Sequence, residues 1–190
     1  MNNDINRAKS FRLKAERFVK LVEHHLAFLE KAGGYAESRF RESDDRAQRR
    51  EFIPFNNAVE VAEPLIFCLL HGIELELKAS LIGKPNFKFD HKLPNLIEKF
   101  KESEPNSPLL LAVNECVVAI KGLVGDAAGV LGDGGETLAN TKIDQWYEDM
   151  RYPERRNGTD KPDPLQFNIA DEEQWRSFSN AVSRFRDVQR

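Results

Sequence analysis

The sequence has little of what disulfide-rich, zinc-binding or membrane-spanning proteins need. Only two of its 190 residues are cysteine, Cys68 and Cys116, and both lie within apolar runs. Two cysteines cannot build a disulfide framework or, alone, a zinc site, so we expect both to be small buried residues in a reducing compartment. The longest apolar run, 65–70, is far too short to cross a bilayer, and no apolar signal region opens the chain. We therefore expect a cytoplasmic protein that needs no metal and no cofactor.

A strong net charge and strand-like patterns are also missing. The formal net charge of -3 gives no general attraction to nucleic acids or anionic membranes. No stretch alternates apolar and polar residues over the length of a strand. The hydrophobic share of 41% and the charged share of 31% are typical of a globular protein, and 190 residues can bury a substantial core. These features predict one all-α domain over 1–190, with a core at about 5–131 and a C-terminal loop and final helix within 136–190.

The spacing of apolar residues predicts a bundle of about five to six helices. The expected helices are 5–31, 55–82, 91–103, one that opens at Ser107-Pro108, 136–150, and a last one capped by Asp171. The segment 55–82 carries apolar residues on every face, which is typical of a helix surrounded by others. Gly83 and Pro85 are expected to end it, and Asp90 to cap the helix that follows. The range 154–168 is predicted to be a long polar loop.

Three separated segments carry the polar residues of greatest interest. They are His71-Gly-Ile-Glu-Leu-Glu-Leu-Lys-Ala, then His91-Lys-Leu, then Met150-Arg-Tyr-Pro. In this order they resemble the HEPN superfamily (higher eukaryote and prokaryote nucleotide-binding), whose members often contain Glu-Leu-x-Leu-Lys-Ala followed by His-x-Leu. The resemblance is strongest over 55–103. It implies a helical bundle that commonly pairs into a homodimer and forms its cleft at the junction.

The central segment permits two interpretations. Glu74 and Lys78 stand four residues apart on one helix, close enough to pair, and His71 is within reach of Glu74. Lys78 could bind an RNA or nucleotide phosphate in a cleft between helices. It could equally form a structural ion pair, with its aliphatic stem over apolar neighbours. His91 is expected to fix the start of the next helix, so Glu74, Lys78 and His91 form a structural motif in either case.

The Arg-Tyr-Pro segment is a second candidate site. Pro153 ends a helix and sets an extended exit, which makes it part of the structural motif. Arg151, Arg155 and Arg156 then form a cationic cluster beside Tyr152, a combination that suits single-stranded RNA or phosphate. Alternatively, Arg151 pairs with nearby carboxylates and fastens the loop to the bundle.

One departure from the resembling family bears directly on catalysis. HEPN ribonucleases resemble one another in an arginine, four to six intervening residues and a histidine late in the domain, and this chain has no histidine after His91. Arg17 and His24 have a similar spacing, but they lie in the first predicted helix. The sequence therefore favours a non-catalytic binding or regulatory module for RNA, a nucleotide or a separately encoded partner protein. The alternatives are a metal-independent endoribonuclease with a displaced site, at Arg17 and His24 or at His91, and a purely structural scaffold.

Overall fold

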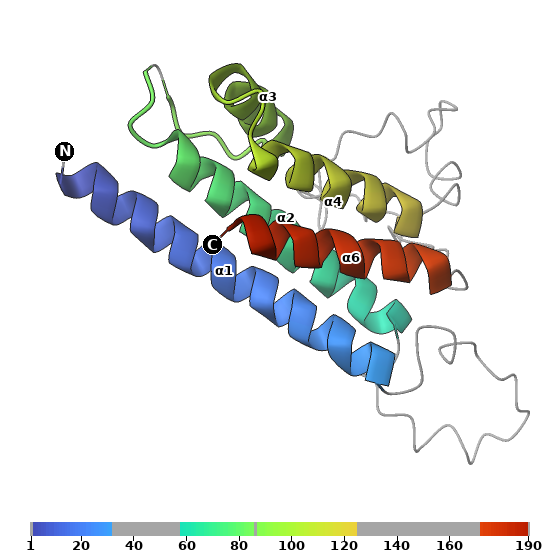
Figure 1. The fold of residues 1–190 in the computed structure, drawn as a ribbon. Coiled ribbons are helices and arrows are strands. Elements are labelled where there is room, and N and C mark those ends of the chain that lie inside the picture. The colour runs from blue at the N-terminus through green and yellow to red at the C-terminus, as the bar shows by residue number, and fades with distance from the viewer. Residues whose placement is uncertain (1, 32–57, 86, 125–171, 190) are drawn as a thin grey trace, which may run out of the picture.

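The described part of the chain is a bundle of five helices with no strand. The computed structural model describes residues 2–31, 58–85, 87–124 and 172–189. Its helices are α1 (Asn2–Lys31), α2 (Ala58–Leu81), α3 (Leu93–Ser103), α4 (Pro108–Val124) and α6 (Glu172–Val188), shown in Figure 1. The prediction of an all-α bundle is confirmed. The predicted helix 136–150 and the predicted loop 154–168 lie outside the described residues.

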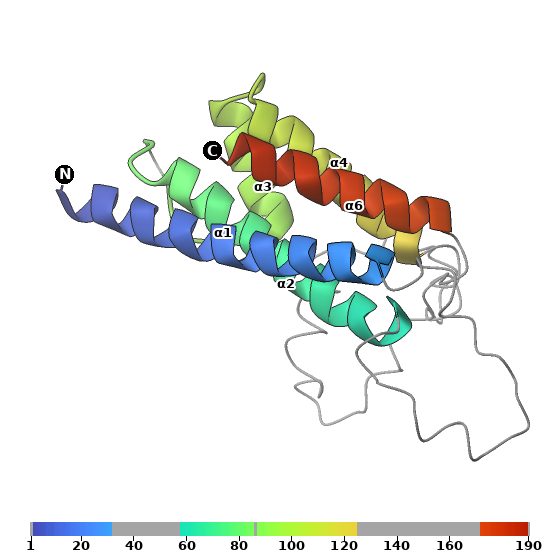
Figure 2. The same ribbon diagram turned by 60° about the horizontal axis from the view of Figure 1, so that its bottom comes forward.

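The two longest helices, α1 and α2, pack side by side in opposite directions (Figures 1 and 2). Their close approach depends on Gly72, which faces α1. A Cβ atom at position 72 would lie 3.1 Å from Val19 Cγ2 and 3.4 Å from the backbone oxygen of Ala15. Because glycine has no Cβ, the backbone of α2 can rest directly on α1 at this point.

Helix α6 packs against α4 and also reaches α1, so it closes the bundle. Its aromatic side chains supply much of the bulk of the core. Trp175, Phe178 and Phe185 are at most 1% exposed, and Val182 is fully buried beside them. The apolar residues recur every three or four positions, which places them all on the face of α6 that meets α4 and α1.

Both cysteines are free and contact the core. The prediction that both are buried is confirmed for Cys116, whereas Cys68 is only partly buried. Burial raises the pKa of the Cys116 thiol to about 12, with a smaller contribution from the charge of Glu115. Burial also raises the pKa of the half-buried Cys68. Neither thiol is therefore activated as a nucleophile. None of the helices in the described ranges is long and apolar enough to cross a membrane.

The connection between α2 and α3 brings the later site residues together. Helix α2 ends at Leu81, and Gly83 continues the chain with a φ of 85°, a left-handed conformation that favours glycine. The prediction that Asp90 caps the next helix is wrong, because the N-cap of α3 is Lys92. The Asp90 carboxylate instead accepts hydrogen bonds from the Lys92 amide and from Asn95 Nδ2. It thus forms a local turn just before the helix.

Candidate functional site

Three charged residues are buried along the C-terminal half of α2. Glu74, Glu76 and Lys78 are 1%, 4% and 4% exposed. A buried charge costs free energy unless opposite charges and hydrogen bonds compensate it. The helix can carry all three because each has partners supplied by a neighbouring element.

Glu74 is the centre of a small polar network. Its Oε1 accepts a hydrogen bond from Lys78 Nζ at 2.5 Å, across one turn of α2. Its Oε2 lies 3.3 Å from His71 Nδ1, one turn earlier. His91, from the connection to α3, places its Nδ1 3.1 Å from both Glu74 Oε1 and Lys78 Nζ. The Nδ1 atom can donate to the carboxylate or accept from the ammonium, according to the tautomer of the imidazole.

The network extends from a buried ion pair to an exposed imidazole. The side chains of Glu74 and Lys78 are 1% and 5% exposed, whereas that of His91 is 76% exposed. His91 therefore ties the segment before α3 to the buried ion pair and leaves most of its imidazole at the surface. Of the two interpretations of Lys78, this geometry fits the structural ion pair, because its ammonium group already has two partners and little access to a ligand.

Glu76 serves the opposite side of α2. Arg12 Nε donates to Glu76 Oε1 at 3.3 Å and Gln189 Nε2 donates to Glu76 Oε2 at 3.3 Å. The carboxylate thus joins α1, α2 and the end of α6. Burial raises the pKa of Glu76, although Arg12 and Gln189 oppose this effect.

The first turns of α1 lie beside the connection between α2 and α3 in both views of the molecule (Figures 1 and 2). The Arg7 guanidinium carbon is 3.8 Å from the centre of the Phe89 ring, a cation–π contact. Phe89 also meets Phe11 and Phe87 edge-on, with centroid distances of 6.1 and 5.1 Å. We call this region the basic–aromatic corner; it comprises Arg7, Phe11, Phe87, Lys88, Phe89, His91 and Lys92.

Positive charge in the corner is available to a ligand. Among the described residues, Arg7, Lys88 and Lys92 have no carboxylate partner, and all three are exposed. Phe89 is 43% exposed, so part of its ring is open to solvent beside the Arg7 cation. The one carboxylate within 83–92 is Asp90. Burial alone would raise its pKa, but hydrogen bonds from Asn95 and Lys92 and the nearby charge of Lys99 lower it, so it stays ionised at neutral pH.

The structure describes only some of the predicted site residues. Arg151, Tyr152, Pro153, Arg155 and Arg156 lie outside the described residues. The structure does bring together Glu74, Lys78 and His91, the members of the predicted motif on α2 and before α3.

The described residues do not support the alternative of a ribonuclease site at Arg17 and His24 or at His91. Arg17 and His24 are both exposed on α1, and no hydrogen bond joins them. Neither His24 nor His91 has an arginine partner within 2–31, 58–85, 87–124 and 172–189. The same ranges contain no group of three or more histidine, cysteine or acidic side chains that could hold a metal ion.

Sequence reasoning did not find the contact between Arg7 and Phe89. The two residues are separated by most of α1, all of α2 and the segment between them, so no local pattern links them. A weaker signal was present in Phe87-Lys-Phe-Asp-His-Lys, where aromatic and basic residues alternate in a short segment between helices. Comparisons of the chain with protein-family models, with curated proteins and with solved structures found no match.

Proposed function

We propose that this protein is a cytoplasmic, HEPN-like helical bundle that acts as a non-catalytic RNA-binding module, with the basic–aromatic corner as its binding surface. The observation that carries the proposal is the exposed Phe89 ring, stacked by Arg7 and flanked by Lys88 and Lys92. The resemblance over 55–103 agrees with such a role.

The corner has the two components that single-stranded RNA binding needs. Aromatic rings stack on bases, and each stacked base contributes about 1–3 kcal/mol. Exposed lysine and arginine side chains neutralise backbone phosphates, and the release of condensed counterions adds to the affinity at low salt. The Arg7 guanidinium lies over one face of the Phe89 ring, which leaves the outer side of the guanidinium and the exposed part of the ring for a base. Lys88 and Lys92 lie on either side of Phe89 in the chain.

The buried network of Glu74 and Lys78 fixes the position of the corner through His91. His91 lies between Lys92 and the corner's aromatic residues, and its contacts with Glu74 and Lys78 hold the connection against α2. A preformed surface loses less conformational entropy when it binds a ligand than a mobile one does. In this proposal Glu74, Lys78 and His91 position the corner, and none of them performs chemistry on RNA.

The test is fluorescence anisotropy with a labelled single-stranded RNA, with cleavage followed on gels of the same mixtures. Phe89→Ala is expected to weaken binding roughly tenfold, the effect of removing the ring on which one base stacks. Arg7→Gln should weaken binding and lower the dependence of log Kd on log salt concentration by about 0.7 for each phosphate that residue 7 no longer neutralises. Lys31→Gln, at the far end of α1, is the matched control and should leave the affinity unchanged.

Three results would contradict the proposal. RNA affinity that is the same in the wild type, Phe89→Ala and Arg7→Gln would exclude the corner as the binding surface. RNA cleavage that disappears in His24→Ala or His91→Gln would identify an endoribonuclease. If no RNA binds at all, a protein-binding scaffold becomes the better explanation.

We also propose that the protein forms a homodimer through the outer face of α4 and α6. Leu111 and Val118 on α4 are 65% and 69% exposed and stand seven residues apart, so they share one side of the helix. Large apolar side chains exposed together on a helix are typical of an interaction surface.

A further inference from the structure

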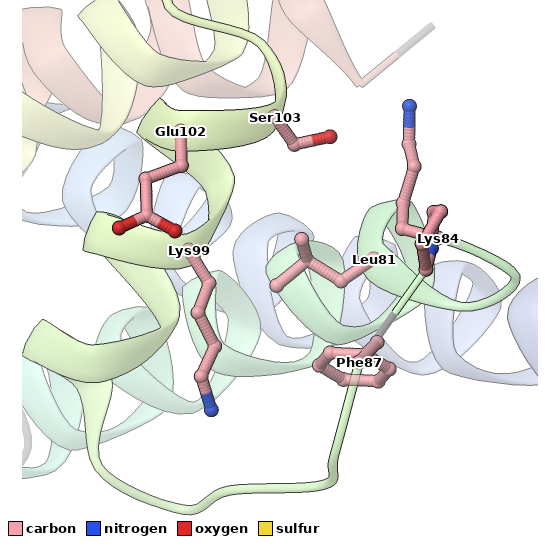
Figure 3. Close-up of a pocket in the computed structure, with 7 residues that line it drawn as sticks. Leu81, Lys84, Phe87, Lys99, Glu102 and Ser103 are labelled. Atoms are coloured by element: carbon pink, nitrogen blue, oxygen red, sulfur yellow. The ribbon is translucent and has the colours of Figure 1, made fainter.

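A pocket opens on the side of the α2–α3 connection that faces α3, next to the basic–aromatic corner. It has a volume of about 380 Å³, within the range of roughly 300–1,000 Å³ that is usual for small-molecule sites. Figure 3 shows the side chains that surround it, which come from the end of α2, the connection and α3. They include Leu81, Lys84, Phe87, Lys99, Glu102 and Ser103.

The floor of the pocket is apolar and suits a flat ring. Leu81 is 2% exposed and lies at the centre of the pocket in Figure 3, with the Phe87 ring beside it. Phe87 also contacts Phe89 edge-on at a centroid distance of 5.1 Å. The pocket and the basic–aromatic corner are therefore adjacent through these two rings.

Two lysines stand on opposite sides of this floor (Figure 3). The Lys84 and Lys99 side chains are 39% and 38% exposed, so both can turn toward a ligand. Lys84 donates to Glu104 at 2.8 Å, an exposed pair that contributes little stability. Lys99 Nζ lies 3.5 Å from Asp90 Oδ2, and that carboxylate already accepts from Asn95 and the Lys92 amide. Phosphate oxygens can recruit both lysines at small cost.

The rim also carries an acceptor of a specific kind. An ionised carboxylate such as that of Glu102 only accepts hydrogen bonds, and its two oxygens match two adjacent N–H donors. Guanine presents such a pair, N1–H and the N2 amino group, on one edge. Adenine and cytosine place an acceptor nitrogen next to their amino group, and uracil has a single N–H between two carbonyl groups. The neighbouring Ser103 hydroxyl can donate or accept beside it.

We infer that this pocket binds one guanine nucleotide of the RNA, with the base over Leu81 and Phe87, its Watson–Crick edge on Glu102, and the phosphates on its two sides bound separately by Lys84 and Lys99. The inference rests on the proposed function, because the corner supplies the rest of the RNA-binding surface. It adds sequence preference to a surface that stacking alone would leave indifferent to sequence.

The experiment compares labelled octauridine with three versions in which one central residue is guanosine, inosine or adenosine. Inosine keeps the N1–H group of guanine but lacks the N2 amino group. The wild type should bind the guanosine version roughly tenfold more tightly than the adenosine version, with inosine between them. Unlabelled GMP and inorganic phosphate, added as competitors, show whether the pocket accepts the free nucleotide or only guanine within RNA.

Three variants on α3 locate the effect. Glu102→Gln should abolish the preference for guanosine over adenosine, because an amide no longer offers two acceptors. Lys99→Gln should weaken all four RNAs by a similar factor. Lys101→Gln, on the same helix but outside the pocket, is the control and should change neither quantity. These side chains are partly or fully exposed, so the variants should retain the helical circular dichroism and melting temperature of the wild type.

The outcomes separate the two proposals. Equal affinity of the wild type for all four RNAs, or a guanosine preference that survives in Glu102→Gln, would overturn the guanine pocket and leave the corner as a binder without sequence preference. Failure of the wild type to bind any of the four RNAs would overturn the proposed function itself.

Discussion

At the residue scale, the buried pair of Glu74 and Lys78 restricts which residues α2 can carry at these two positions. Two charges that are 1% and 5% exposed lose nearly all of their hydration, and each compensates the other across one helical turn. A buried charge that loses its partner is strongly destabilising, whereas replacing both charges with apolar residues is often neutral. A substitution of Glu74 or Lys78 alone is therefore expected to destabilise the protein, unless the other residue is replaced as well.

This expectation gives a prediction for stability. Lys78→Met should lower the free energy of unfolding by about 3–5 kcal/mol, because the buried Glu74 carboxylate then loses the lysine that compensates its charge. The double variant Glu74→Leu, Lys78→Met should recover most of that loss. Urea unfolding followed by circular dichroism measures both. The control is Lys20→Met, which breaks an exposed pair of the same spacing with Glu16 and should cost at most about 0.5 kcal/mol. Equal losses in Lys78→Met and Lys20→Met would contradict the role of burial.

A second residue-scale prediction concerns pH. Because burial raises the pKa of Glu76 above its ordinary value of 4.5, the folded state holds this proton to a higher pH than the unfolded state does. The contribution of Glu76 to stability therefore falls as the pH rises from 4.5 through the folded pKa, and is constant above it. Glu76→Gln cannot titrate. Relative to that variant, the wild type should lose stability as the pH is raised above 4.5 in urea titrations. A gain over the same interval would show that Arg12 and Gln189 outweigh burial.

At the scale of elements, the crossing of α1 and α2 depends on the absence of a side chain at Gly72. Gly72→Ala would gain about 1 kcal/mol of helix propensity but must push aside Val19, which is fully buried. Overpacking of a rigid core typically costs about 1–3 kcal/mol, so we expect a net loss of about 1 kcal/mol and a lower melting temperature. Gly122→Ala is the matched control, since its new methyl group meets only the end of the flexible Gln174 side chain. A melting temperature that rises equally in both variants would contradict the close crossing.

The sequence predicted the positions of the helices better than it predicted the site. Apolar spacing of three and four predicted 5–31 and 55–82, and the structure has α1 at Asn2–Lys31 and α2 at Ala58–Leu81. Pro108 opens α4 as predicted, and the Ser107 hydroxyl accepts a hydrogen bond from the Leu109 amide. The start of α3 was misplaced because an aspartate that forms a turn before a helix has the same sequence signature as one that caps it.

The site was less predictable, for a physical reason. Glu74 and Lys78 are neighbours on one helix, so their pairing follows from spacing alone. Whether Lys78 faces a cleft or the core depends on the elements packed around it, and spacing holds no information on these. Arg7 and Phe89 meet only because α1 and α2 run antiparallel and the chain turns back at Gly83. Contacts of this kind follow from the fold as a whole.

At the scale of the whole molecule, the two proposed surfaces belong to different parts of the bundle. The basic–aromatic corner lies where the start of α1 meets the connection before α3, whereas Leu111 and Val118 project from α4 beside α6. A groove of about 460 Å³ runs between α4 and α6, and the pair of Arg184 and Glu115, at 2.9 Å, lies along it. A two-fold axis through this groove would bury the apolar residues of both copies and leave both corners open to RNA.

The proposed dimer can be tested by its sensitivity to charge. Val118→Glu places a carboxylate where two copies would bury a side chain that is 69% exposed in the single chain, so it should convert a dimer into a monomer in analytical ultracentrifugation. Leu21→Glu is the matched control, because Leu21 is 56% exposed on α1, outside the groove, and its replacement should leave the dimer intact. A wild type that sediments as a monomer at high concentration, or a Val118→Glu variant that remains dimeric, would exclude this face. Because the corner lies outside the groove, monomeric Val118→Glu should bind a short RNA with the affinity of the wild type, and a large loss would instead place the RNA across the dimer.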